Sequence, residues 1–392
     1  MELTLYYITL LAVSLCTTWW VFKKVLHIAK LKNIVDNPGE RKIQRIPVPV
    51  MGGITVFFGM TVAFAAASTI YDISGMFTMI CLMIILLYVG TMDDIVGLSP
   101  GLRFFIEMIV VLLLIYTNDY SINDFHGLWG IYHVPDIVAI PLTVFASVGI
   151  INAINLIDGV NGLCSGYCIV TYLIFGLVFI FAGDVNCTSL AIISIGALIP
   201  FFFHNVFGKT SKMFFGDGGT LLMGIGMSFL VINALKADST LAAYFPDNFG
   251  IVPFTLAILA IPVFDTIRVM VGRIARRTSP FSPDKTHLHH LLMDLHFSHL
   301  GTTCVEILAN LLVIACWYLS YRLGASIDFQ LYIVIFTAAM LTFAFYEYAR
   351  FLERKQTKAY HMLISIGDKT HVGSRKWFGL LQRIMDRNIK TE

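Results

Sequence analysis

The chain has 392 residues, of which 57% are hydrophobic and only 13% are charged, and its formal net charge is +2. Soluble globular proteins carry about twice that share of charged residues, so the composition excludes a soluble protein and is typical of an integral membrane protein. Outside the carboxyl-terminal tail the sequence has no basic stripe with interleaved aromatic residues, and we therefore expect no nucleic-acid partner.

The predicted elements are membrane spans. A helix that crosses the hydrocarbon core needs roughly 20 mostly apolar residues. Eleven runs approach that length, near residues 4–22, 52–70, 76–92, 103–117, 136–153, 163–182, 188–204, 218–235, 250–272, 305–322 and 329–350. This pattern predicts an all-α integral membrane protein, a polytopic bundle of about 11 transmembrane helices in the lipid bilayer.

Lysine and arginine predict the orientation of this bundle, because cytoplasmic loops are enriched in them. With loops assigned to alternating sides, one side carries seven basic residues between positions 23 and 45, seven in later loops and ten from Arg350 to Lys390. The other side carries only Lys236 and Arg322. We therefore expect an external amino terminus, a membrane domain over 1–350 and a basic cytoplasmic tail over 351–392.

Polar residues gather at the cytoplasmic side of this topology. Five segments rich in acids, amides, histidines and cations fall at helix ends or loops there: 36–53, 90–100, 152–163, 204–220 and 273–292. The outer loops contain no comparable cluster. Their convergence predicts a functional site at the cytoplasmic face of the membrane.

Carboxylates mark these segments. Asp93 and Asp94 follow an apolar run, Asp158 precedes a glycine, Asp217 lies between glycines, and Asp265 lies near the inner end of its run. Acids that converge without matching lysines repel one another unless a hard cation lies among them, and Mg²⁺ is commonly held by one or two carboxylates plus substrate phosphates. Each acid taken alone is also compatible with a solvated helix end.

The stretch "NAINLIDGVNGL" places three polar side chains at intervals of three. Asn152, Asn155 and Asp158 would share one face of a helix. The amides could bind a base, sugar or phosphate, with Asp158 beside the metal. The alternative is a polar clamp between membrane helices, which asparagine commonly forms.

Three histidines form the set H-x-H-H at His287, His289 and His290, with the basic residues Arg273, Arg276, Arg277 and Lys285 nearby. These cations favour binding of phosphate. A zinc site that includes Asp284 is the alternative. Lys42 follows the turn-rich "DNPGE" and is either a substrate contact or a topology signal.

The motifs "DNPGERKIQRIPVPVMGG", "MDD", "NAINLIDGVNGL", "FFGDGGT", "PVFDTIR" and "SPFSPDKTHLHH" occur in this order over about residues 33–295. Together they resemble the polyprenyl-phosphate N-acetylhexosamine-1-phosphate transferases, glycosyltransferase family 4. The resemblance is to the bacterial branch that initiates O-antigen, enterobacterial common antigen and teichoic acid linkage units. It is weaker to the muramoyl-pentapeptide translocase branch, which stays an alternative.

The resemblance implies a reaction in the bacterial inner membrane. Undecaprenyl phosphate attacks a UDP-N-acetylhexosamine, most closely UDP-N-acetylglucosamine, and releases UMP, with Mg²⁺ or Mn²⁺ required. The assembly state is left open between one chain and a homodimer.

The resemblance also implies roles for the residues. Asp217 would be the chief metal ligand, assisted by Asp158, and Asp93 and Asp94 would lie beside the lipid phosphate, with Asp93 as base. The substrate-binding residues would be Lys42, Asn152, Asn155, Asn205, Lys212, Arg273, His287, His289 and His290.

This chain departs from the family pattern at two positions. Gly97 and Asn161 stand where the family often has acids, which reduces the local negative charge. A transporter of an anionic substrate is the rival class, but it would favour polar groups at mid-membrane depth and an inverted repeat, and neither is visible.

Overall fold

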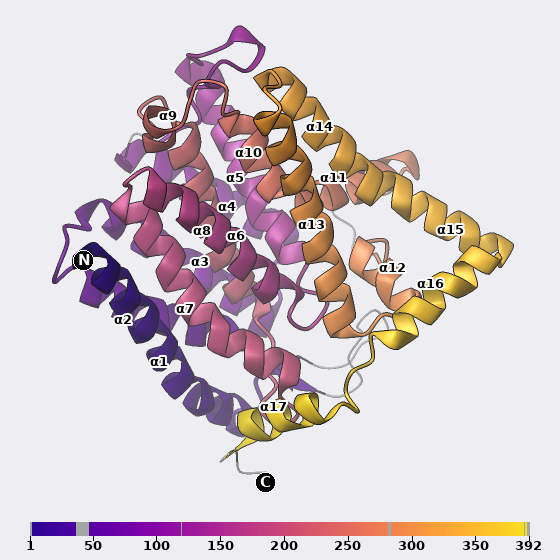
Figure 1. Cartoon of the computed structure of the whole chain (residues 1–392). Coiled ribbons are helices and arrows are strands. Elements are labelled where there is room, and N and C mark those ends of the chain that lie inside the picture. The colour runs from indigo at the N-terminus through magenta and orange to yellow at the C-terminus, as the bar shows by residue number, and fades with distance from the viewer. Residues whose placement is uncertain (1, 37–46, 119, 281–283, 388, 390–392) are drawn as a thin grey trace.

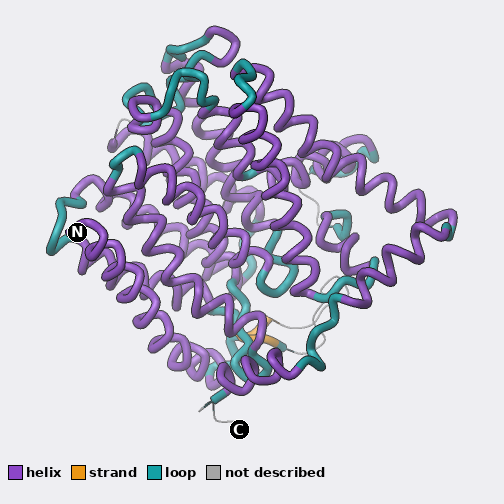
Figure 2. The backbone as a smooth tube through the Cα atoms, viewed as in Figure 1, coloured by secondary structure: helices purple, strands orange, loops and turns teal. Residues whose placement is uncertain are grey.

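The computed structural model describes residues 2–36, 47–118, 120–280, 284–387 and 389, and the chain in these ranges is almost entirely helical (Figure 1, Figure 2). The first half contains α1 Glu2–Leu31, β1 Val35–Asp36, β2 Val48–Pro49, α2 Gly52–Ala67, η1 Ser74–Met76, α3 Phe77–Val96, α4 Pro100–Asn118, η2 Leu128–Gly130, α5 Asp136–Leu156, α6 Leu163–Phe181 and α7 Val185–Phe207. The second half contains α8 Gly216–Leu235, α9 Thr240–Tyr244, α10 Ile251–Ile258, α11 Ala260–Ala275, α12 Leu288–Asp294, α13 His299–Arg322, α14 Ile327–Ala339, the π turn η3 Met340–Ala344, α15 Phe345–Lys355, α16 Lys358–Lys369 and α17 Lys376–Asp386.

The predicted membrane class is confirmed. Within the described ranges, nine helices are long and apolar enough to cross a membrane, and the bent pair α10–α11 makes a tenth. The remaining predicted run, 52–70, forms α2, which has only 16 residues. All eleven runs are thus helical, and the one that falls short of a full span is α2.

Helix α8 occupies the centre of the bundle (Figure 1). After Asp217 its sequence contains no charged residue, and every residue from Gly218 to Leu235 is buried. A helix that is apolar on all sides must be surrounded by other helices, and α8 packs against α2, α3, α5 and α10. The amino-terminal end of α8, which carries Asp217, therefore lies in the middle of one end of the bundle.

The run predicted over 250–272 is broken rather than straight. Its two halves, α10 and α11, meet at an angle of 74°. Pro262 lacks the N–H that would bond to the carbonyl of Ile258. That carbonyl instead accepts hydrogen bonds from the Tyr167 hydroxyl (2.6 Å) and the Asn310 amide (2.9 Å). Side chains from α6 and α13 therefore satisfy the backbone at the break, as an apolar environment requires.

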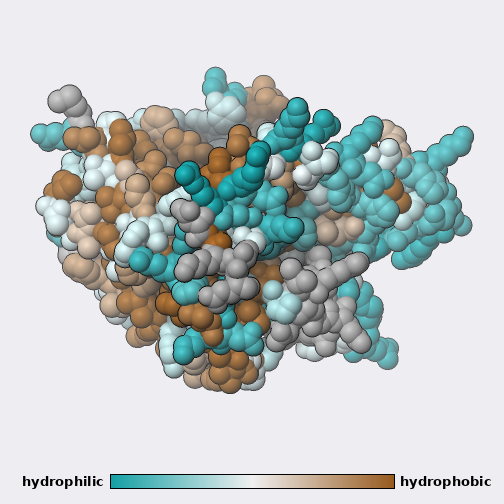
Figure 3. Space-filling view, turned by 90° about the horizontal axis from the view of Figure 1, so that it is seen from below, coloured by the Kyte–Doolittle hydropathy of each residue, from teal (hydrophilic) through white to brown (hydrophobic). Residues whose placement is uncertain are grey.

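The tail is folded. The boundary predicted at residue 350 lies within α15, which continues α14 and η3 as one helical run over Ile327–Lys355. Helix α16 then returns toward the bundle and α17 lies along its lower end (Figure 1). Seen from that end, hydrophilic residues cover the middle and right of the face, and hydrophobic residues dominate its left flank (Figure 3).

Candidate active site

The candidate site is centred on the beginning of α8. Gly216 has φ +74°, a conformation that favours glycine, and a side chain there would meet the Asp94 carboxylate. Asp94, from the end of α3, accepts hydrogen bonds from the backbone N–H groups of Asp217 (3.0 Å) and Gly218 (3.4 Å). Asp94 therefore caps α8, where a negative charge is stabilised by the helix dipole.

Close packing of two helices brings the other acids into place. Gly90 of α3 lies so near Asp217 and Gly218 that a Cβ atom on it would be 2.4 Å from the Asp217 carbonyl carbon. Because Gly90 lies one turn before Asp93 and Asp94, this contact sets both acids beside Asp217. We call Asp93, Asp94, Glu107, Asp158 and Asp217 the acid cluster.

Arg103, near the beginning of α4, joins three members of the acid cluster. Its Nη1 atom lies 3.0 Å from a carboxylate oxygen of Asp93 and 3.0 Å from one of Asp217. Its Nε atom lies 3.6 Å from Glu107, one helical turn away and fully buried. From the sequence, Arg103 is only one of the seven basic residues in later loops that predict the orientation, and Glu107 is given no role.

The predicted amides reach the same cluster. The Asn155 amide donates to Asp217 Oδ1 and to the Thr220 hydroxyl, both at 2.8 Å. The Asn152 amide donates to Glu107 and to the Val148 carbonyl (2.9 Å). Asn155 therefore orients Asp217 directly, and Asn152 acts one residue further away, through Glu107.

Asp158 lies in the turn between α5 and α6, half-buried. Helix α5 ends at Leu156, so the predicted single helical face includes the two asparagines but stops before Asp158. Burial, and then the negative charges of Asp217 and Asp94, raise the pKa of Asp158 well above its usual range. A carboxyl group in this position gains from a nearby cation.

In the acid cluster, carboxyl groups outnumber the cations that pair with them. Within the described residues, Arg103 is the one cation that forms ion pairs with the cluster, and it pairs with three of the five carboxyl groups. No three acid, histidine or cysteine side chains of the described part enclose a metal position. Magnesium, however, needs only one or two protein carboxylates when substrate phosphates complete its shell. Asp217 and Asp93, which share Arg103, fit that requirement.

A second group of charges forms what we call the histidine loop, from Asp265 on α11 to His290 on α12. The buried Asp265 carboxylate accepts from Arg268 (2.7 Å) and from the backbone N–H of Leu288 (3.2 Å). His287 Nδ1 lies 2.9 Å from the same carboxylate. Because a carboxylate only accepts, Nδ1 carries the proton, and His287 Nε2 is buried without a partner among the described residues.

His289 connects the histidine loop to the acid cluster. It is buried, and its Nε2 atom would lie 2.5 Å from a Cβ atom on Gly159, the residue after Asp158. Its Nδ1 atom is buried without a partner among the described residues, and its ring stacks on His287 at 5.6 Å between centroids. Burial, and then the nearby His290 and His287, lower the pKa of His289 well below 6.5. His289 is therefore neutral at pH 7.

Arg273 is engaged inside the histidine loop. Its Nε and Nη2 atoms donate to the two oxygens of Asp284, each at 3.1 Å, and Nη1 donates to the Pro280 carbonyl (2.6 Å). Burial would raise the pKa of Asp284, but hydrogen bonds from Arg273 and Thr286 outweigh it and lower that pKa below its usual range. Arg273 thus shapes the loop and has few donors left for a diphosphate.

The other predicted substrate residues lie around the cluster. Asn205 is buried, accepts from the Gly162 N–H (2.6 Å) and donates to the Met213 carbonyl (2.8 Å), so it joins the Asp158 turn to the loop before α8. Lys212 lies in that loop, and burial lowers its pKa. His290 lies beside His289, with 4.4 Å between ring centroids. Lys42 lies outside the described residues.

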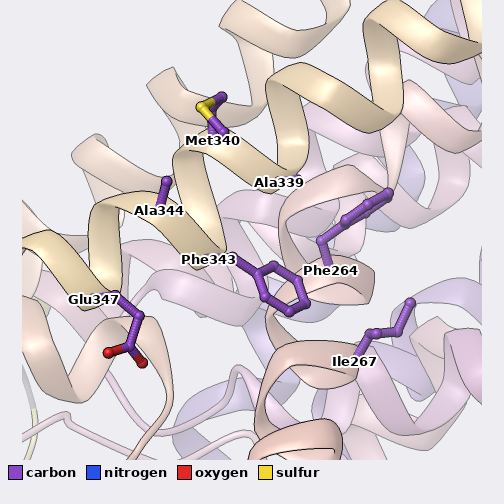
Figure 4. A pocket seen from close by; sticks show the side chains of 7 residues that line it. All are labelled: Phe264, Ile267, Ala339, Met340, Phe343, Ala344 and Glu347. Carbon is purple, nitrogen blue, oxygen red and sulfur yellow. The ribbon is translucent and has the colours of Figure 1, made fainter.

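An apolar cavity of about 500 Å³ lies on the far side of α11 from the acid cluster. Phe264 and Ile267 from α11 and Phe343 from η3 line it (Figure 4). Glu347 is the one ionisable residue in its lining. The cavity suits a hydrocarbon chain rather than a nucleotide.

Known proteins have sequences similar to this one. A model of glycosyl transferase family 4 matches residues 76–235, which include Asp93, Asp158 and Asp217. A protein of Bacillus subtilis, named a probable undecaprenyl-phosphate N-acetylglucosaminyl 1-phosphate transferase, is 33% identical over 295 residues, which are 73% of this chain and 77% of the relative.

Two further relatives are named undecaprenyl-phosphate alpha-N-acetylglucosaminyl 1-phosphate transferases. The one from Escherichia coli is 28% identical over 88% of this chain and 93% of its own length. The one from Yersinia pestis is 29% identical over 82% of this chain and 87% of its own length. The chain therefore belongs to the glycosyl transferase family 4 transferases, the polyprenyl-phosphate N-acetylhexosamine-1-phosphate transferase family that its motifs predict.

Proposed function

We propose that the protein transfers N-acetylglucosamine 1-phosphate from UDP-N-acetylglucosamine to undecaprenyl phosphate. A phosphate oxygen of the lipid attacks the β-phosphorus of the nucleotide sugar, a new P–O bond forms, and the bond between the two phosphates breaks. UMP leaves with the electron pair. The products are undecaprenyl-diphosphate N-acetylglucosamine and UMP.

The acid cluster supports this proposal because it gathers five carboxyl groups, three of which share the guanidinium of Arg103. Asp217, with Asp93 or Asp158, would hold Mg²⁺ or Mn²⁺, and the bound ion would neutralise charge on the transferred phosphate. The second pKa of a phosphate monoester is near 6, so the lipid phosphate is largely ionised at pH 7 and needs little help from a base. We therefore give neither Asp93 nor Asp94 the role of a base: Asp94 caps α8, and Asp93 binds Arg103 and could bind the ion with Asp217.

The histidine loop supports binding of the diphosphate and sugar. Two buried ring nitrogens, His287 Nε2 and His289 Nδ1, have no partner among the described residues. In a neutral histidine only one ring nitrogen donates, so His289 Nδ1 could donate to a phosphate oxygen, whereas His287, which donates from Nδ1 to Asp265, could accept at Nε2 from a sugar hydroxyl. His289 packs on the Asp158 turn, so a nucleotide sugar bound there reaches the acid cluster.

The lipid and the setting follow from the surrounding helices. The apolar cavity beside Phe264 and Phe343 offers a surface for a polyprenyl chain. The basic loops and tail support a site on the cytoplasmic face of the bacterial inner membrane. The reaction would then be the first membrane step of a cell-envelope polysaccharide pathway of the O-antigen, common-antigen or teichoic-acid type.

One observation carries the proposal: at the beginning of α8, Asp217 lies together with Asp93, Asp158 and Asn155. The test is UMP release by the purified protein supplied with undecaprenyl phosphate, Mg²⁺ and a panel of UDP-sugars. We expect release with UDP-N-acetylglucosamine. Release only with UDP-N-acetylmuramoyl-pentapeptide would assign the chain to the other branch, and release with no donor in either Mg²⁺ or Mn²⁺ would contradict the proposal.

A further inference from the structure

The outward faces of α16 and α17 are apolar along one edge and basic along the next. On α17 the exposed residues Trp377, Leu380 and Ile384 follow one another at intervals of three and four. Beside them lie the exposed Lys376, Arg383 and Arg387. The opposite side of α17 carries the buried Met385, so most of the outward stripe lies away from the face that packs on the protein, and only Trp377 borders it, beside Phe207.

The position of α17 is fixed by its acid. Asp386 accepts hydrogen bonds from three successive backbone N–H groups, those of Lys209 (3.2 Å), Thr210 (3.1 Å) and Ser211 (2.9 Å). These bonds lower the pKa of Asp386, against the effect of burial. The one acid of α17 therefore faces the protein.

Contacts with two spans complete the attachment of α17. Lys23, on α1, donates to the Arg387 carbonyl (2.9 Å), and Phe207, the last residue of α7, contacts the rings of Trp377 and Phe378. Helix α17 is thus held at the ends of two membrane spans, at the level where the bilayer surface must lie.

Helix α16 also carries exposed apolar residues together with exposed basic residues. Met362 and Ile366 are exposed, one turn apart, and Lys358 and Lys369 are exposed at its two ends. Gly367 faces inward and is buried. Its end is attached through Thr370, whose hydroxyl accepts from the Ser298 N–H (2.8 Å) and whose carbonyl accepts from the Ser298 hydroxyl (2.8 Å).

We propose that α16 and α17 lie in the plane of the membrane surface and bind the bilayer's own anionic phospholipids. The apolar stripe enters the boundary of the acyl chains, and the basic edge contacts lipid phosphates. Helices with an apolar face and a Lys/Arg-rich polar face bind anionic lipid surfaces in this way, and tryptophan favours that depth. Helix α17 is attached at the end of α7 and at Lys23, which directly follows the apolar part of α1. The bilayer surface passes through that position, so we take the surrounding bilayer as the partner of the stripe.

The test uses Trp377 in the full-length protein reconstituted into vesicles. The fluorescence lost in Trp377→Phe is the contribution of Trp377 among the five tryptophans. We expect acyl-brominated phospholipids to quench more than half of that contribution and aqueous iodide to quench little. The reverse pattern would overturn the proposal. Should Trp377→Phe fold poorly, Leu380→Trp in wild type provides an added reporter on the same stripe, with the same expected result.

A second arm tests the basic edge. In vesicles with phosphatidylglycerol, iodide quenching of Trp377 should be weaker than in vesicles of phosphatidylcholine alone. The triple variant Lys376→Gln, Arg383→Gln, Arg387→Gln should lose this difference. The control Arg322→Gln, an exposed basic residue at the other end of α13 from Ser298, should keep it. Equal quenching in both vesicles for wild type, or an unchanged difference in the triple variant, would contradict binding of anionic lipid.

Discussion

The acid cluster and the histidine loop lie at the same end of the bundle but treat charge in opposite ways. In the acid cluster, Arg103 is shared by Asp93, Asp217 and Glu107. In the histidine loop, Asp265 has its own arginine and a histidine, and Asp284 has Arg273 on both oxygens.

From this difference we infer that the acid cluster, and not the histidine loop, would bind a further cation. Carboxylates that are individually paired need no further ion, whereas carboxylates that share one guanidinium repel one another until another cation arrives. The histidine loop instead leaves two buried ring nitrogens, His287 Nε2 and His289 Nδ1, without a partner among the described residues. We therefore expect the acid cluster to depend on the metal and the histidine loop to depend on the nucleotide sugar.

The largest effect should come from Asp217→Asn. An amide is a much weaker ligand for Mg²⁺ than a carboxylate, so turnover should fall by about 10²–10³, as when one strong transition-state contact is removed. UMP release in saturating Mg²⁺ measures this. The control is Asp247→Asn, an exposed acid in the loop between α9 and α10 at the other end of the bundle, which should keep wild-type activity.

Arg103→Gln sharpens the comparison by removing the shared cation. Turnover should fall by about 10–100-fold because Asp93 and Asp217 lose their common partner. The Mg²⁺ concentration for half-maximal activity should also fall, since the ion no longer competes with a guanidinium. A titration of UMP release against Mg²⁺ gives both values. A higher Mg²⁺ requirement would mean that Arg103 helps to hold the metal site open.

Arg273→Ala should act on stability. Asp284 would lose two hydrogen bonds from a buried guanidinium, a cost of about 1–3 kcal/mol. Thermal unfolding in detergent measures it, and Arg273→Ala combined with Asp284→Ala should cost less than the sum of the two single changes. A large rise in KM for the UDP-sugar with unchanged stability would instead indicate that Arg273 binds the diphosphate of the substrate.

His289→Ala should weaken use of the nucleotide sugar. Loss of one hydrogen bond to a charged group corresponds to about a tenfold rise in KM for the UDP-sugar, with KM for the lipid unchanged. Initial rates over both substrates separate the two. His133→Ala, an exposed histidine at the opposite end of the bundle, is the matched control, and equal effects of the two changes would dissociate His289 from the substrate.

The smallest effect concerns pH. The pKa of His289 is lowered below 6.5 by burial and by His290 and His287, with Asp265 acting against them. Below that pH the unfolded chain binds more protons than the folded one, so stability is complete above pH 6.5 and declines as the pH falls. Each pH unit costs at most about 1.4 kcal/mol for one group. Thermal unfolding should therefore move to lower temperature at about pH 5.5, and His289→Asn should reduce the change.

Much of the site could be predicted because it depends on residue types in short motifs. Asp93 is predicted from its place after an apolar run, Asp217 from its place between glycines, and Asn155 from its helical spacing, and helix packing brings them together. Arg103 and Glu107 are missed as site residues: their spacing of four residues favours a pair on one helix, but nothing in the sequence indicates that Asp93 and Asp217 join Arg103. Their contact depends on side-chain direction on α4.

Other features depend on tertiary partners that spacing does not reveal. The motif predicts that Arg273 binds a substrate phosphate. In the structure its guanidinium donates to Asp284, eleven residues away. The break at Pro262 needed Tyr167 and Asn310 from distant helices to satisfy one carbonyl. The helices of the tail could have been predicted from their amphipathic pattern, but their attachment through Asp386 could not.

The most direct test of the account is the metal dependence of UMP release by the purified protein given UDP-N-acetylglucosamine and undecaprenyl phosphate. We predict that UMP and undecaprenyl-diphosphate N-acetylglucosamine form in equal amounts with Mg²⁺ and that EDTA stops the reaction. Asp217→Asn should slow it by about 10²–10³, and Asp247→Asn should leave it unchanged. Release that persists in EDTA, or activity of Asp217→Asn within about tenfold of wild type, would contradict a metal-dependent transfer at the acid cluster.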